Sequence, residues 1–120
     1  METDTWAWLT SVGGNPVAGD AEVPLTFLGG TEAQLFLYTI LVKRRSGTSV
    51  TPIQPRVYAT SGDAVNGVSQ RFLAEQVAAG TLVHVTAINR PTLTDATGKL
   101  YLKVGGDASD LFDYEVWAQV

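Results

Sequence analysis

The chain has 120 residues, enough for one domain with a single hydrophobic core, and this length excludes a multidomain enzyme. Charged residues make up 17% of the chain, against about 25% in typical soluble domains, while 45% are hydrophobic and the mean hydropathy is +0.10. A monomer with so few charges either covers its surface with neutral polar residues or buries part of that surface against another chain.

The charge balance and the lengths of the apolar runs argue against nucleic acid and membranes as partners. The net charge is −4 and the pI is about 4.7, so the broad basic face that binds nucleic acid is missing. The longest apolar run, Leu35 to Val42, is far shorter than the ~20 residues that cross a bilayer. Acidic residues stand at positions 2 and 4, where a secretory signal carries Lys or Arg. We therefore expect no nucleic acid, no membrane and no signal-directed export. Cysteine is absent, which excludes disulfides and thiolate chemistry.

The N-terminal segment contains two tryptophans at alternate positions, Trp6 and Trp8, and residues 13–16 (Gly-Gly-Asn-Pro) separate it from the body. We interpret residues 1–20 as an arm and linker, and residues 21–120 as the folded domain. The arm either folds back as an edge strand of its own domain or docks on a neighbouring molecule, where tryptophan commonly anchors binding.

Glycine-containing turn signals recur at strand-plus-turn spacing along the rest of the chain, which is typical of a β-sandwich or barrel. Strands are predicted at residues 22–28, 35–42, 56–60 and 82–88. The run 35–42 lacks alternation, which predicts burial on both of its faces. Pro52 and Pro55 keep residues 51–54 out of any central strand. Residues 69–79 fit either a short helix, with Ser69 as its N-cap and Gly80 at its end, or a strand.

The C-terminal part contains two segments with a period of two, residues 99–104 and 112–120. Read as an antiparallel hairpin, they set Lys99 and Lys103 against Asp113 and Glu115 on the solvent face. Alternation places Trp117 in the same polar row. A partner would then cover its ring, unless a bulge reverses the register and turns Trp117 into the core.

Candidate chemistry is sparse. His84 is the only histidine and lacks a recognisable triad context, so we interpret it as structural. Asp107, Asp110 and Asp113 could suggest calcium, but their spacing does not match an EF-hand loop, and a solvated turn is the simpler interpretation. Residues 97–99 (Thr-Gly-Lys) do not complete a phosphate-binding loop. The sequence therefore predicts no catalytic residue, no cofactor and no metal, and a hydrolase using His84 is the weakest alternative.

Lys43, Arg44 and Arg45 form the only basic cluster, at the end of the long apolar run. They are either a solvated strand end or a contact for an acidic partner surface. Together with the tryptophans they complete the candidate interface residues, which are Trp6, Trp8, Lys43, Arg44, Arg45 and Trp117. The predicted fold is an all-β, antiparallel, jelly-roll-like sandwich with an N-terminal arm.

A small cysteine-free chain rich in Gly, Ala, Thr and Val, with the closing segments 100–104 (Leu-Tyr-Leu-Lys-Val) and 112–117 (Phe-Asp-Tyr-Glu-Val-Trp), resembles virion proteins of tailed bacteriophages. It is most similar to the small capsid decoration, or cement, proteins. The resemblance implies a sandwich that is made in the host cytoplasm and assembles as a homotrimer or homodimer. This oligomer would sit on the capsid surface, bind the major capsid protein and bridge coat subunits. The alternative is a carbohydrate-binding module in which Trp117 and Tyr101, on one hairpin face, form an aromatic platform.

Overall fold

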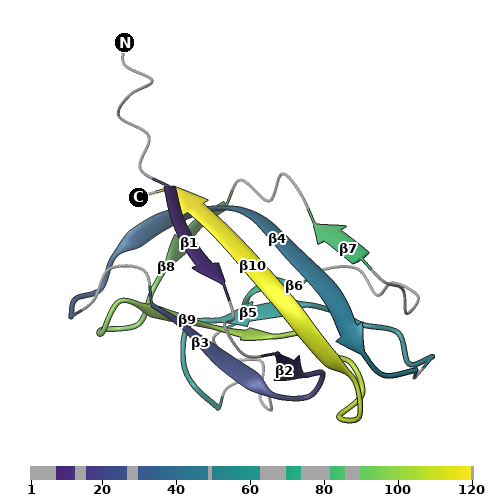
Figure 1. Cartoon of the computed structure of the whole chain (residues 1–120). Helices are drawn as coiled ribbons and strands as arrows, with labels where there is room; N and C mark the ends of the chain where they lie inside the picture. Colours follow the sequence, from purple (N-terminus) through teal and green to yellow (C-terminus); the bar gives the residue numbers. More distant parts are fainter. Residues whose placement is uncertain are drawn as a thin grey trace.

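The computed structural model shows two antiparallel β-sheets (Figure 1). It describes residues 8–12, 16–26, 30–48, 50–62, 70–73, 82–85 and 90–119. Sheet A has the strand order β1-β10-β4-β7, with β2 paired to β10 and β8 paired to β4, and sheet B has the order β3-β9-β5-β6. The strands are β1 (Trp8–Val12), β2 (Val17–Ala18), β3 (Glu22–Thr26), β4 (Gln34–Ser46), β5 (Arg56–Tyr58), β6 (Gln70–Leu73), β7 (Leu82–Val85), β8 (Arg90–Leu93), β9 (Lys99–Lys103) and β10 (Leu111–Gln119).

The main strands pair from the ends of the sequence inward. β1 pairs with β10, β3 with β9, β4 with β7, and β5 with β6. This nesting describes one long antiparallel ribbon, and the ribbon folds over so that β4 also pairs with β10 and β5 with β9. The result is the two-sheet jelly-roll arrangement. The predicted all-β, jelly-roll-like sandwich is confirmed, and the described residues include no helix.

The core lies between the two sheets and follows from the period of two in their strands. Buried and half-buried residues alternate without interruption along β9 and β10. The inward residues of each sheet pack on those of the other and include Leu25, Val57, Leu100 and Leu102 from sheet B and Leu37, Ile40, Val42, Phe112, Val116 and Ala118 from sheet A. Complete burial of one such large side chain contributes about 1.5–3 kcal/mol.

The long strand β4 carries a bulge that explains its unusual sequence. Ala118 of β10 stands opposite Leu37, whereas Trp117 stands opposite Thr39, so residue 38 is an extra residue on β4. A bulge shifts the alternation by one position. Leu35 and Leu37 therefore point inward before it, and Ile40 and Val42 do so after it. The prediction that residues 35–42 are buried on both faces is wrong at Phe36, which is 47% exposed.

The predicted C-terminal hairpin is wrong. β9 and β10 follow one another in the chain but lie in opposite sheets, β9 between β3 and β5 and β10 between β1 and β4. Lys99 and Lys103 therefore do not face Asp113 and Glu115. In a folded-over ribbon, consecutive strands are joined across the sandwich, so closeness in sequence is a poor guide to pairing.

The N-terminal segment joins sheet A. β1 and β2 both pair with β10, so the fold-back alternative applies to residues 8–12. The other strand predictions are confirmed at β3, β4, β5 and β7, although β5 ends at Tyr58, two residues before the end of the predicted strand 56–60. Of residues 69–79, positions 70–73 form strand β6 and the remainder lie outside the described residues. Ile53, between Pro52 and Pro55, makes only an isolated bridge.

Strand β8 is not predicted by the sequence, because Pro91 cannot donate to a sheet ladder. It pairs with the first residues of β4, Gln34 to Leu37, at an edge of the sheet, where proline is tolerated. None of the described segments is a helix that could span a bilayer.

Candidate functional site

On the outer face of sheet A, positive side chains lie on one strand and negative side chains on the neighbouring strand. β4 presents Lys43 and Arg45, and the neighbouring β10 presents Asp113 and Glu115. Asp113 stands opposite Lys43, and Glu115 stands opposite Leu41. One strand is therefore positive and the next negative along the same stretch. A register of this kind stabilises the sheet locally and also creates a surface with both signs of charge.

The opposite end of the same face is apolar. Phe36 on β4 is 47% exposed and Leu93 on β8 is 42% exposed. Phe36 stands opposite Pro91, which is also exposed, and Leu93 is two residues further along β8. Exposed large hydrophobic residues that lie together are typical of contact surfaces.

Trp117 lies on this outer face and not in the core. Its position on β10 is half-buried, between the fully buried Val116 and Ala118, so the alternation continues past the bulge in β4. The indole Nε1 donates a hydrogen bond to the Glu115 carboxylate. The alternative of a reversed register with Trp117 in the core is therefore wrong, while its role as an interface residue stays a prediction.

The other two tryptophans are placed only through the backbone. Trp8 begins β1 and stands opposite Gln119 of β10. Its side chain and the whole of Trp6 lie outside the described residues.

The basic cluster does not form one patch. Lys43 is exposed on the outer face, and Arg45 is exposed beside it, with its Nε 2.9 Å from Oδ1 of Asp113. Arg44 points to the other side of the strand, where its Nη1 lies 4.0 Å from Oδ2 of Asp110. Two of the three cations are thus engaged by acids of the same chain, which weakens the prediction of a single site for an acidic partner.

The Arg44–Asp110 pair fastens the end of β4 to the loop before β10. Asp110 is only 1% exposed, and Arg44 Nη1 also donates to the Gly47 carbonyl at 3.5 Å. Gly47 has a φ of +103°, and a Cβ there would lie 2.0 Å from Oδ1 of Asp110. The turn therefore requires glycine both for its backbone conformation and for the space that the buried carboxylate occupies.

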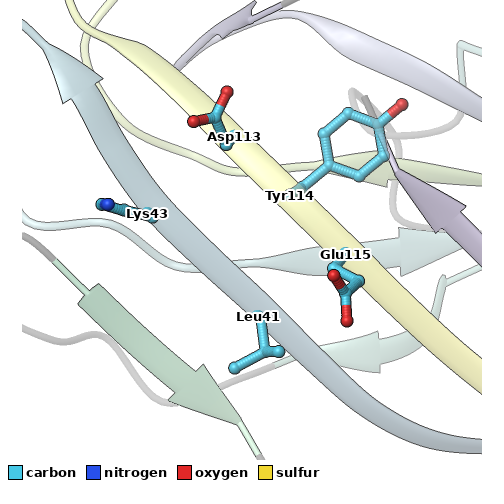
Figure 2. Close-up of a pocket in the computed structure, with 5 residues that line it drawn as sticks. All are labelled: Leu41, Lys43, Asp113, Tyr114 and Glu115. Atoms are coloured by element: carbon cyan, nitrogen blue, oxygen red, sulfur yellow. The ribbon is translucent and has the colours of Figure 1, made fainter. Parts of the chain in front are cut away.

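A shallow groove of about 200 Å³ runs along the charged end of the outer face (Figure 2). Leu41 and Lys43 line it from β4, and Asp113, Tyr114 and Glu115 from β10. A second hollow of about 340 Å³ lies over the turn at residues 44–48. The groove is smaller than the ~300–1,000 Å³ of typical small-molecule sites and the hollow over the turn is at the lower end of that range, so this part of the molecule is better suited to a surface contact than to enclosing a ligand.

Sheet B has its own polar centre, at the turn between β8 and β9. The Asp95 carboxylate accepts hydrogen bonds from Thr97 N and Oγ1, from Lys99 N and from the Tyr101 hydroxyl, at 2.7–3.0 Å. The side-chain bond from Thr97 is the largest cause that lowers the pKa of Asp95 from 3.8 to about 2. Burial, followed by the hydrogen bond to Asp95, raises the pKa of Tyr101. The sequence Thr97-Gly98-Lys99 is thus part of a tight turn organised by Asp95.

The remaining chemical candidates are not brought together. Asp107 accepts hydrogen bonds from Ser109 N and Oγ, Asp110 is paired with Arg44, and Asp113 is paired with Arg45. The described residues include no group of three His, Cys, Asp or Glu side chains able to hold a metal ion. His84 stands opposite Leu41 in the ladder, and its side chain lies outside the described residues.

The prediction that Trp117 and Tyr101 share one face, as an aromatic platform for a sugar requires, is wrong. Trp117 is on β10 of sheet A, and Tyr101 is on β9 of sheet B. The two residues are half-buried on the outer sides of different sheets. A sugar ring therefore cannot stack on both.

Three residues that shape the two faces were not singled out from the sequence. Phe36 and Leu93 were hidden because the bulge in β4 and the proline of β8 obscure the alternation that would mark them as outward. Asp95 did have a local signal, since an Asp two residues before Thr-Gly often accepts hydrogen bonds from its own turn.

Comparison with known families and with curated sequences identifies no relative of this chain. No protein-family model matches the chain, and no curated protein sequence is significantly similar to it.

Proposed function

We propose that this protein is a structural component of a tailed-phage virion, which binds the outside of the capsid as a homo-oligomer and stabilises the shell by bridging coat subunits. The observation that carries the proposal is the outer face of sheet A. There, exposed apolar side chains lie beside charges of both signs on a regular sheet. Exposed apolar side chains next to charged ones are typical of a protein–protein contact, which a homo-oligomer requires.

The fold by itself does not select this function, because jelly rolls serve in capsids and lectins alike. What supports a binding role over catalysis is the shallow groove, together with acidic side chains that are already paired with cations or with donors of their own turns. What favours a protein partner over a sugar is the separation of Trp117 from Tyr101.

Bridging requires that one assembly touch more than one coat subunit. A homo-oligomer supplies several copies of the same contact, and linked contacts strengthen binding without any new interaction. We assign to Trp6, which precedes strand β1 in the sequence, the contact with a neighbouring coat subunit.

Cosedimentation with empty shells of the phage that encodes the chain tests the proposal. We expect saturable binding with a fixed number of copies per shell, and greater resistance of the decorated shells to heat. Removal of residues 1–7 should weaken binding, and Trp6→Ala is the matched single substitution. Residues 8–12 must be kept, because their loss would remove strand β1 from sheet A.

Two results would contradict the proposal. One is the absence of binding to shells by the full chain at micromolar concentration. The other is a saturable change in tryptophan fluorescence on titration with sugars, which would support a carbohydrate-binding module instead.

A further inference from the structure

We propose that two copies of this chain pair face to face through the outer faces of sheet A, about a two-fold axis that runs parallel to β4 and β10. The inference rests on the proposed function in so far as that function requires a homo-oligomer. It deepens that function by assigning the outer face of sheet A to the contact between copies and by naming the symmetry of the oligomer, which leaves the coat contact to the N-terminal residues that include Trp6.

Charge complementarity selects the second copy as the occupant of this face. In a two-fold interface each patch must complement itself. β4 contributes Lys43 and Arg45, and β10 contributes Asp113 and Glu115. An axis between the two strands and parallel to them lays β4 of one copy over β10 of the other. The positive strip then meets the negative strip twice, once on each side of the axis.

The apolar end selects the same axis. Rotation about an axis parallel to the strands preserves position along them, so Phe36 lies over the Gln119 end of β10 of the second copy, away from the charged end of either strand. An axis across the strands would instead lay Phe36 of one copy on Lys43 and Arg45 of the other. That arrangement would bury charges against apolar side chains, at considerable cost in free energy.

The face has the size of a stable contact. With about 3.4 Å per residue along β10 and about 4.8 Å between strands, sheet A measures about 30 by 20 Å. Its flat area of about 600 Å² approaches the roughly 800 Å² per partner of a standard interface, before side chains add relief. The β3 and β8 edges are poorer sites for pairing, because Pro24 and Pro91 lack the backbone donor.

A pair of charge-reversal variants tests the arrangement through solution mass. The first variant, Lys43→Glu/Arg45→Glu, makes both strips negative, and the second, Asp113→Lys/Glu115→Lys, makes both positive. We expect the unmodified chain to have twice its 12.8 kDa mass by light scattering. Each variant alone should be monomeric, with self-association at least tenfold weaker. An equimolar mixture of the two variants should restore the dimer, because each negative strip now meets a positive one.

The matched control is Lys99→Glu/Lys103→Glu. It changes the net charge as the first variant does but alters β9 of sheet B, and it should stay dimeric. Circular dichroism confirms that every variant is folded. If a double variant fails to fold, the single changes Lys43→Glu and Asp113→Lys replace it in the same mixing experiment.

The outcomes separate this inference from the proposed function. A monomeric or trimeric unmodified chain, or a mixture of variants that stays monomeric, overturns the pairing. If such a chain still cosediments with shells, capsid binding stands without this dimer. A dimer that passes the mixing test but does not bind shells confirms the pairing and refutes the capsid role.

Discussion

The outer faces of the two sheets differ in how their polar groups are satisfied. On sheet B, the Glu22 carboxylate accepts hydrogen bonds from Ser61 Oγ and Gly62 N, and Asp95 accepts four more from its own turn and strand β9. On sheet A, the acids and cations are sorted onto neighbouring strands, and the large apolar side chains Phe36 and Leu93 are exposed at one end.

This difference indicates which face of the sandwich stabilises the fold and which face is available to bind a partner. Carboxylates bound by backbone and hydroxyl donors hold loops in place and offer little to a partner. Exposed ion pairs contribute only about 0–1 kcal/mol to folding, so charges such as Arg45 and Asp113 can be used for recognition with small effects on stability. We therefore expect substitutions on sheet B to change stability and those on the outer face of sheet A to change association. The pair of Arg44 with the buried Asp110 is the exception on sheet A.

The largest effect is expected at that exception. Gly47→Ala should reduce the free energy of unfolding by about 3 kcal/mol in urea titration, because a Cβ would strain the backbone and displace the buried Asp110 from Arg44. The control is Gly30→Ala, which has a similar φ of +92° but no atom within 4 Å of the added Cβ. It should cost about 1 kcal/mol. Equal losses at the two glycines would show that the carboxylate is not held as described.

Asp95→Asn on sheet B should have an intermediate effect, about 1–2 kcal/mol at pH 7, since the amide accepts fewer of the four hydrogen bonds. Folding lowers the pKa of Asp95 from 3.8 to about 2, so the ionised carboxylate stabilises the fold fully above pH 3.8. That contribution is lost as the pH falls through about 2.

The measurement is urea unfolding of the unmodified chain and the variant between pH 7 and pH 2. The difference between them should be constant down to about pH 4 and should then shrink. Asp113→Asn on the outer face of sheet A is the matched control and should cost less than Asp95→Asn at pH 7, because its partner Arg45 is 53% exposed. A larger loss at Asp113 would reverse the comparison of the two faces.

The smallest effect on stability is expected at the apolar end of sheet A. Phe36→Ser should change the free energy of unfolding by less than about 1 kcal/mol, because the side chain is already half exposed. It should nevertheless raise the dissociation constant of the dimer at least tenfold by sedimentation equilibrium. Val50→Ser, at a position 88% exposed and outside sheet A, should leave the dissociation constant unchanged. Loss of association with both variants would show that the effect is not specific to the face.

Part of the candidate surface could be predicted from the sequence. Trp117 was placed on the polar side of its strand because unbroken alternation from Phe112 onward sets each side chain by its neighbours, and the structure agrees. The Lys43–Arg45 cluster is visible in the sequence but misleading, because Arg44 stands opposite the inward Phe112 whereas Lys43 stands opposite the outward Asp113. The apolar end could not be predicted, since Phe36 lies in a run where the bulge conceals which residues face out.

The sequence alone is enough to predict the class of fold and most of the strands, because a period of two and glycine turns are local properties of the chain. It also determined that Phe112, Val116 and Ala118 belong to the core, through the same alternation. Which strands are neighbours could not be predicted from the sequence and is seen only in the folded chain. Pairing β10 with β1 and β4, and separating it from β9, depends on how a folded-over ribbon packs the apolar face of one sheet against that of the other. That requirement involves the whole chain, and it is what brings the positive strand β4 beside the negative strand β10.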